Sequence, residues 1–439
     1  MSTVADSEPS VGSRAGEARL GGWSRAQGEP DWLREWRVNA WQTHAATPLP
    51  HRAEHLWRYS DPAEYEPAAD PLAGFDAAPR PNVPLTGSPL GPTAKVTRSL
   101  CDAMRDESHG EHFGDAERVR SLLGSLVPPT FGRVEALAAA TFTHGWYVRA
   151  GRGATVELPL RLEFGLENER RFGSTRSLVE IEDGAVVTLV ETVRGGPTAA
   201  IQSKPALQHL HVSEVVIGAN CQVQHVLVQE AGAGTQLHWT HRASVGRGST
   251  YRPVLLSFGG LATKLDLGTL LAGERAETEL SAFLCGIGRQ RFDHHTVHHH
   301  LAPRTRSDLN FRTVLEGRAR SAYTGLIRIE SAAPFSEAYQ ENRNLLLSDS
   351  ARAESIPELE ILTQEVQCKH GATVGPIDLM QLFYLTSRGI PPTEAVRMIV
   401  SGHFEGTLRR LPDALRVSFE PLLESRLGRL QARESRGAR

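Results

Sequence analysis

Cysteine and lysine are scarce in this chain of 439 residues. The four cysteines are scattered and include no C-x-x-C pair, which predicts a reducing, cytosolic environment and no disulfide framework. None of the four lysines follows a glycine, so the chain has no G-x-x-x-x-G-K-[ST] phosphate loop. It also lacks G-x-S-x-G, a complete G-x-G-x-x-G and H-E-x-x-H. These absences argue against several common enzyme classes.

Long apolar runs and excess charge are missing as well. No run approaches the ~18 apolar residues of a membrane span, so we expect no membrane partner. The net charge is −3 and there is no basic stripe with interleaved aromatics, which argues against nucleic acid as a partner. Residues 1–27 are polar, without the apolar stretch of a secretion signal, and predict a disordered tail.

The remaining sequence divides into zones by local pattern. One zone is rich in short runs of β-forming residues, and small-residue turns such as "EDGAV" (182–186) and "IGANC" (217–221) recur between these runs. More than 200 residues of this texture predict stacked β rungs, although a β-sandwich would give the same local signals. We therefore expect an N-terminal helical region with a connector at 28–140, a β core at 141–375, a C-terminal helical region at 376–425 and a basic tail at 426–439.

The C-terminal helical region has two amphipathic stretches. In "IDLMQLFYLTSRGIPP", apolar residues that include Leu382, Phe383 and Leu385 form a wide face, which predicts packing on the β core and contact with a partner. Thr393 is expected to cap the next helix, whose apolar face includes Val400 and Phe404.

Two stretches contain candidate metal ligands. "FDHHTVHHHLAP" (292–303) has five histidines between His294 and His300. On a strand, His294, His298 and His300 would face one way and the other two the opposite way, and a ladder of neutral, packed histidines is the plainer interpretation. "QCKHGATVG" (367–375) places Cys368 and His370 on one face of a strand, and both residue types bind metals.

Three segments near the second stretch carry a family resemblance. They are "NLLLSDSARAESIPELEI", "CKHGATVG" and "LFYLTSRGI", and "GEPDWLREWR", "LWRY" and "HTVHHHLAP" agree with them. The chain resembles the SufB/SufD family of iron–sulfur cluster assembly scaffolds over most of residues 28–410. The resemblance implies a mainly β fold: a right-handed parallel β-helix core flanked by N-terminal and C-terminal helical regions.

Within that family the chain is similar to the D-type subunit, SufD. Gly371 follows His370 where the B-type carries an acidic residue, and Asn342 stands where the B-type has a cysteine. The resemblance implies a non-catalytic scaffold that pairs with a SufB-like subunit through the end of the β-helix and binds a SufC-like ATPase through its C-terminal helices. It also implies a metal-site role for His370 at the subunit interface, and for Cys368 with less weight.

An iron–sulfur cluster usually needs about four protein ligands, mostly thiolates. One cysteine near His370 cannot supply them, so we expect a transient cluster, or iron, that is shared with a partner subunit. Two other functions are compatible with the sequence: a purely structural subunit without ligation, and a metal-dependent β-fold enzyme that uses the histidine tract. The sequence leaves flavin binding, the cluster type and a homodimer open.

Overall fold

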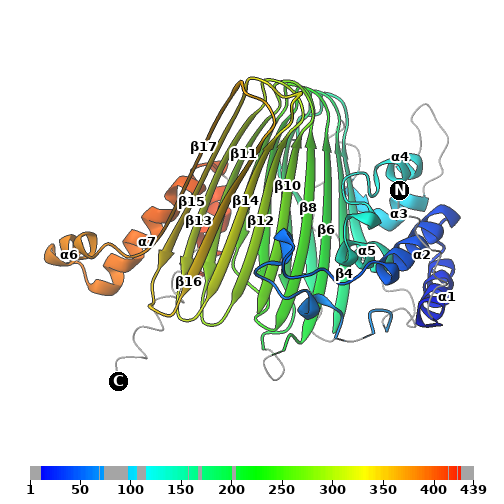
Figure 1. Ribbon diagram of the computed structural model, residues 1–439, viewed down its shortest axis with the longest axis horizontal. Helices are drawn as coiled ribbons and strands as arrows, with labels where there is room; N and C mark the ends of the chain where they lie inside the picture. The colour runs from blue at the N-terminus through cyan, green and yellow to red at the C-terminus, as the bar shows by residue number, and fades with distance from the viewer. Residues whose placement is uncertain are drawn as a thin grey trace.

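The protein is a two-sheet parallel β-solenoid with helices at both ends of the chain (Figure 1). The architecture was obtained as a computed structural model, and it describes residues 11–68, 70–73, 97–105, 115–156, 158–166, 171–199, 204–413, 415–422 and 424–426. The expectation of a mainly β, parallel rung architecture is therefore confirmed. Among the described residues, no helix has the length and apolar character needed to cross a bilayer.

Successive strands alternate between the two sheets, so that each turn of the solenoid adds one strand to each sheet. Sheet A contains, in spatial order, β1 (Thr97–Ser99), β2 (His144–Ala150), β4 (Phe172–Ile181), β6 (Leu207–Ile217), β8 (Thr235–Val245), β10 (Ala262–Leu271), β12 (Arg291–His300), β14 (Arg320–Ile329) and β16 (Arg352–Ile361). Sheet B contains β3 (Leu160–Leu166), β5 (Val186–Gly195), β7 (Gln222–Ala231), β9 (Thr250–Ser257), β11 (Glu277–Gly286), β13 (Arg306–Leu315), β15 (Ser336–Leu346) and β17 (Val366–Pro376).

The repeated small-residue turns form corners between the sheets. Gly184, Asn220 and Gly248 occupy equivalent corners from sheet A to sheet B, and all three have positive φ. Glycine enters this region without steric cost and asparagine tolerates it, which explains why such residues recur in the turns. The corners keep the rungs in register, so that inward positions stack into one continuous apolar core between the sheets.

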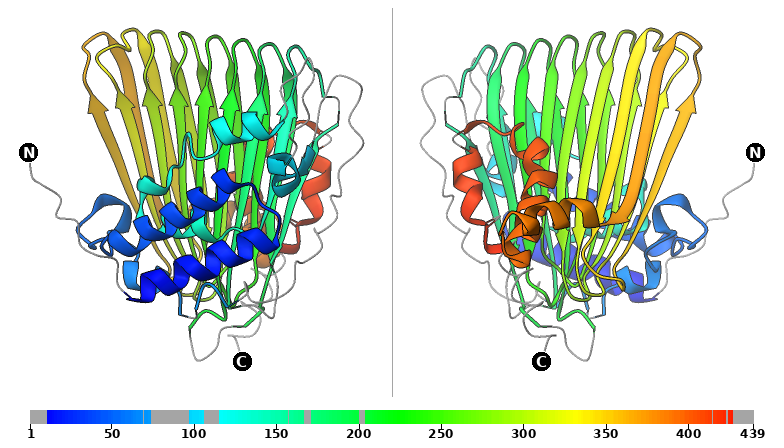
Figure 2. Two further views of the ribbon diagram at one scale, coloured as in Figure 1. Left: turned by 90° about the vertical axis from the view of Figure 1, so that its right-hand side faces the viewer. Right: turned by 90° about the vertical axis from the view of Figure 1, so that its left-hand side faces the viewer.

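The N-terminal helices lie against the outer face of sheet A (Figure 2). They are α1 (Val11–Ala26), α2 (Asp31–Ala46), η1 (His55–Trp57), η2 (Pro62–Tyr65), α3 (Leu100–Arg105), α4 (Asp115–Leu122), η3 (Pro129–Phe131) and α5 (Arg133–Thr141). The expected disordered tail at 1–27 is wrong for residues 11–26, because α1 packs against α2 and buries Leu20. Residues 1–10 and most of the expected connector lie outside the described residues.

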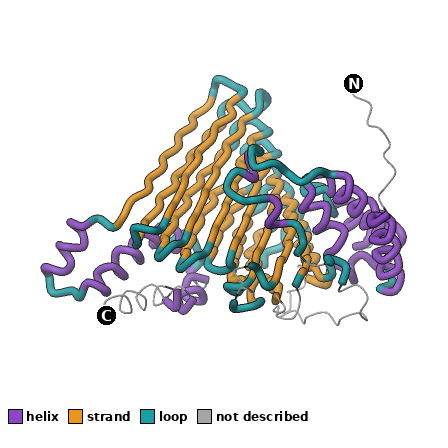
Figure 3. The backbone as a smooth tube through the Cα atoms, turned by 60° about the horizontal axis from the view of Figure 1, so that its bottom comes forward, coloured by secondary structure: helices purple, strands orange, loops and turns teal. Residues whose placement is uncertain are grey.

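The C-terminal helices α6 (Leu379–Ser387) and α7 (Pro392–Leu408) follow β17 and differ in how they pack (Figure 3). Val400 and Phe404 of α7 are buried against the outer face of sheet B, where Phe404 contacts Phe283. In contrast, α6 buries none of its residues, so the expectation that it packs on the β core is wrong. Pro391, rather than Thr393, is the N-cap of α7.

Candidate functional site

The candidate ligands Cys368 and His370 lie at the end of the solenoid from which the chain enters its C-terminal helices, called the open end here. β16 and β17 are the terminal strands of the two sheets, with no further described strand beyond them. β17 pairs in parallel with β15, which aligns Cys368 with Ala338 and His370 with Gln340. Ala338 and Gln340 are buried, so their neighbours on β17 face the same inward side of the rung. The structure thus places both candidates on one face, as the C-x-H spacing predicts.

Cys368 is the less available of the two ligands. Its side chain is half-buried against a small apolar cluster that contains Ile327 and Ala338. Burial raises the pKa of the Cys368 thiol. Because the thiolate is the form that binds metals, this environment reduces the affinity of Cys368 for iron at neutral pH.

His370 is exposed and has open space beside it. A Cβ built on Gly371 would meet no atom within 4 Å, so another chain can approach this part of β17 closely. The Gln340 amide on the adjacent strand is buried, and neither its nitrogen nor its oxygen has a hydrogen-bond partner among the described residues. A buried amide without a hydrogen-bond partner is costly in a packed core.

The inward positions of β15 next to His370 carry amides rather than strong metal ligands. Asn342 and Asn344 continue the buried face of β15, and the Asn344 amide donates to the Asn342 side-chain oxygen over 2.6 Å. Within the described part of the chain, no three His, Cys, Asp or Glu residues are arranged to hold a metal ion. The open end therefore offers one exposed imidazole and one partly shielded thiol, fewer than the about four ligands that a cluster requires.

The histidine tract is different, because its side chains are already packed. His294, His298 and His300 are buried inside the solenoid, and burial lowers their pKa values to about 3, 4 and 3. His295 and His299 point the other way and contact Asp293 and Glu330, each over 2.8 Å. The expected alternation is thus present, and the inward histidines are neutral core residues at physiological pH.

The same core contains a buried carboxylate, that of Glu191, which no pattern in the sequence pointed to. Glu191 accepts hydrogen bonds from Ser177 and Ser213 over 2.5 and 3.0 Å, and its oxygens lie 2.9 Å from His211 and 3.3 Å from His225. Burial alone would raise the pKa of Glu191, but the hydrogen bonds and charges of the two histidines outweigh it and keep this pKa well below its usual range. The partners come from three other strands, so only the stacking of rungs brings them together.

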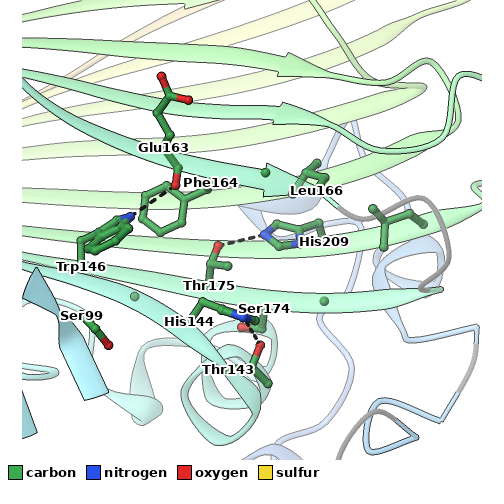
Figure 4. Close-up of a pocket in the computed structure, with 14 residues that line it drawn as sticks. Ser99, Thr143, His144, Trp146, Glu163, Phe164, Leu166, Ser174, Thr175 and His209 are labelled. Carbon is green, nitrogen blue, oxygen red and sulfur yellow. Dashed lines mark hydrogen bonds between the residues drawn. The ribbon is translucent and has the colours of Figure 1, made fainter. Parts of the chain in front are cut away.

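This network reaches a small cavity at the opposite end of the solenoid (Figure 4). Thr175 connects the network with the cavity: its hydroxyl lies 2.7 Å from His211 of the network and 2.9 Å from His209, which lines the cavity. Trp146 and Phe164 form apolar parts of the cavity wall, and the cavity volume is about 60 Å³. That space has the volume of a few water molecules, and Thr175 and His209 are among the polar groups that line it beside the apolar walls.

An exposed apolar patch on α6 is the second feature that a partner could recognise. The exposed fractions of Leu379, Met380, Phe383 and Tyr384 range from 59 to 76 %. Met380 and Tyr384 also line a hollow between the two helices, together with the exposed Met398 of α7. Adjacent large apolar side chains of this kind mark an interaction surface, since water contact with them is unfavourable.

Comparisons with known proteins agree with the resemblance of the sequence. The family described as "SUF system FeS cluster assembly, SufBD core domain" matches residues 164–403. An iron–sulfur cluster assembly SufBD family protein of Synechocystis is 30% identical over 241 residues, which are 54% of this chain and 53% of that protein. A related protein of Mycobacterium leprae is 28% identical over 289 residues, 66% of this chain and 33% of that protein.

Two relatives from Bacillus subtilis match almost end to end. The iron–sulfur cluster assembly protein SufB is 25% identical, with 91% of this chain and 90% of that protein covered. SufD is 26% identical, with 90% of this chain and 93% of that protein covered. Such similar identities do not choose between the two subunit types. The match to the core domain does decide the family: the chain belongs to the SufBD family of SUF-system iron–sulfur cluster assembly proteins.

Proposed function

We propose that the chain is a D-type, non-catalytic scaffold subunit of a cytosolic complex that assembles iron–sulfur clusters. In this proposal the open end pairs with a SufB-like subunit, and His370 contributes one ligand to a nascent cluster that the two subunits share. The observation that carries the proposal is the position of His370: exposed, inward-facing and on a terminal strand without enough further ligands to complete a site.

Incomplete ligation suits the transfer of a cluster. A full set of ligands from one chain would hold the cluster firmly. A single imidazole from this chain would hold it weakly, so that the cluster is released when the partner surface moves. Because the sequence has no phosphate loop of this type, the proposal places ATP hydrolysis in such a complex on another chain. The apolar patch on α6 is the surface that we assign to a SufC-like ATPase.

The decisive experiment compares His370→Ala with Lys369→Ala in the complex produced together with its SufB-like and SufC-like partners. Lys369 is also exposed on β17 but is aligned with Tyr339, on the opposite face of the strand. We expect His370→Ala to form the complex at the wild-type yield but to carry far less iron and sulfide, and Lys369→Ala to match the wild type. Native mass spectrometry measures assembly, and chemical analysis measures iron and sulfide.

Cys368→Ala is expected to have a milder effect than His370→Ala, because burial of the Cys368 thiol raises its pKa and reduces the thiolate form. Wild-type iron and sulfide in an intact His370→Ala complex would assign the chain a purely structural role. The alternative of an enzyme with a metal on the histidine tract is less well supported, because His298 and His300 are buried in the packed core and no three His, Cys, Asp or Glu side chains of the described residues are arranged there to hold a metal.

A further inference from the structure

A pocket on the outer face of sheet A combines five arginines and has no role in the proposed function. It lies between the N-terminal segment 52–65 and the starts of β12, β14 and β16, and its volume is about 450 Å³. Figure 1 shows this segment crossing the strands in front of sheet A. The pocket is called the arginine pocket here, and it is lined by Arg52, Arg58, Arg291, Arg320 and Arg352.

Three of these arginines stack in register on neighbouring strands. Arg291 of β12 is aligned with Arg320 of β14, which is aligned with Arg352 of β16. Like charges on adjacent strands, about 4.8 Å apart, repel each other and destabilise a sheet. A column of three arginines therefore requires compensating negative charge.

At the corresponding position of sheet B, the charges on neighbouring strands alternate in sign. Arg306 is the first residue of β13, as Arg320 is of β14, and it is aligned with Glu277 on one side and Glu337 on the other. The signs alternate in that column, so each charge has opposite neighbours. The contrast indicates that the like-charged column of sheet A is a feature of this pocket and not of rung starts in general.

The acidic residues of the arginine pocket are already engaged. Glu64 forms two hydrogen bonds with Arg291, of 3.0 and 2.8 Å. Asp293 contacts Lys264 over 2.8 Å and also His295, and Glu354 is hydrogen-bonded to Tyr59.

Four guanidinium groups are left without a carboxylate partner within the described residues. The Arg320 side chain has no hydrogen bond to any of the described residues. Among the same residues, the Arg352 side chain donates only to the backbone carbonyls of Asp349 and Ala351. Arg58 lies near the Tyr59 ring, and Arg52 is exposed. The pocket consequently carries an excess of positive charge that faces a space large enough for a small molecule.

We propose that the arginine pocket binds a small polyphosphate anion, either inorganic or the phosphate groups of a nucleotide. Guanidinium groups recognise phosphate oxygens through paired, charge-assisted hydrogen bonds. A polyphosphate concentrates several charges within a few ångströms, which matches arginines on adjacent strands. Carboxylates on one face of an extended peptide are about 6.6 Å or more apart and fit this spacing less well. The proposal is independent of the role of His370.

Calorimetric titration of the full chain at low salt tests the proposal, with pyrophosphate, ADP and a triglutamate peptide as probes. We expect pyrophosphate to bind, and Arg320→Gln to weaken it about tenfold, which corresponds to about 1.4 kcal/mol. The matched control is Arg306→Gln, which changes an exposed arginine at the same rung position of sheet B and should leave the affinity within about twofold. Both residues are exposed, so both variants should fold.

Each outcome of the titration has a defined meaning. Tighter binding of ADP than of pyrophosphate supports the proposal and identifies a nucleotide as the ligand, and equal binding supports recognition of phosphate groups alone. The proposal is overturned if the wild type does not bind pyrophosphate, or if Arg306→Gln weakens binding as much as Arg320→Gln. Tighter binding of triglutamate than of pyrophosphate also overturns it and makes the pocket a docking site for acidic peptides.

Discussion

At the residue scale, the inward histidines link the core to pH. His298 lies between Thr269 and Ile327 in its inward column, and neither ring nitrogen has a hydrogen-bond partner among the described residues. Burial lowers its pKa from the ordinary value of 6.5 to about 4. Between these two values the unfolded chain binds a proton that the folded chain does not bind. The contribution of His298 to the free energy of unfolding therefore decreases as the pH falls from about 6.5 to about 4.

We predict that His298→Leu reduces the loss of stability between pH 7 and pH 5. The change removes a group that contributes up to about 1.4 kcal/mol per pH unit in this range. Thermal midpoints at the two pH values measure the effect. His299→Leu is the control, because His299 is only half-buried and contacts Glu330 on the outer face. The same pH dependence in His298→Leu as in the wild type would show that the buried imidazole is not responsible.

At the element scale, α6 and α7 share a sequence pattern but differ in environment. Both have an apolar face, yet α7 covers sheet B and α6 extends into solvent. Deletion of both helices would uncover the apolar surface around Phe283 on sheet B. Such a deletion could not distinguish the loss of a partner site from damage to the core. Point substitutions separate the two effects.

We predict that Phe383→Ser abolishes capture of the SufC-like ATPase while the stability of the chain changes by less than about 0.5 kcal/mol, because Phe383 is 65 % exposed. Phe404→Ala should instead destabilise the chain by about 3–5 kcal/mol, since Phe404 is buried against Phe283. Pull-down and chemical denaturation measure the two properties. Wild-type capture by a folded Phe383→Ser chain would place the ATPase surface outside α6.

At the scale of the whole molecule, the two ends of the solenoid are unequal. At one end, the antiparallel strand β1 pairs with β2, and helices lie nearby. At the other end, β16 and β17 each have one backbone edge that pairs with no further strand of the described residues, and Ile361 and Val374 are 38 and 46 % exposed. Unpaired edges beside apolar side chains favour pairing with strands of another chain.

We predict that Ile361→Lys combined with Val374→Lys prevents association with the SufB-like subunit, and also any homodimer, while the chain remains folded. A charge at a strand edge must be desolvated when another strand pairs there. Val186→Lys is the control, because Val186 is a similarly exposed valine, 43 %, at the start of β5. Sedimentation and co-purification measure association. Undiminished pairing in the double variant would contradict an interface at this end.

Several features of the molecule followed from local sequence. The small-residue turns around Gly184 and Asn220 indicated stacked rungs, because turn chemistry is decided within a few residues. Alternation of the histidines followed from the period of a strand. The network of Glu191 and the arginine pocket could not be predicted in this way, because their residues come from segments far apart in the chain.

By itself, the sequence determined the succession of short strands and turns, the alternation of side chains between the two faces of a strand, and the placement of Cys368 and His370 on one face. Each of these depends on neighbours along the chain. Tertiary structure decided which of these positions meet solvent. The inward face that buries His298 in β12 leaves His370 exposed in β17, because β12 has a neighbouring strand on each side, whereas β17 has a neighbouring strand of the described residues on one side only. Burial depends on the number of covering rungs, and that number is a property of the assembled solenoid.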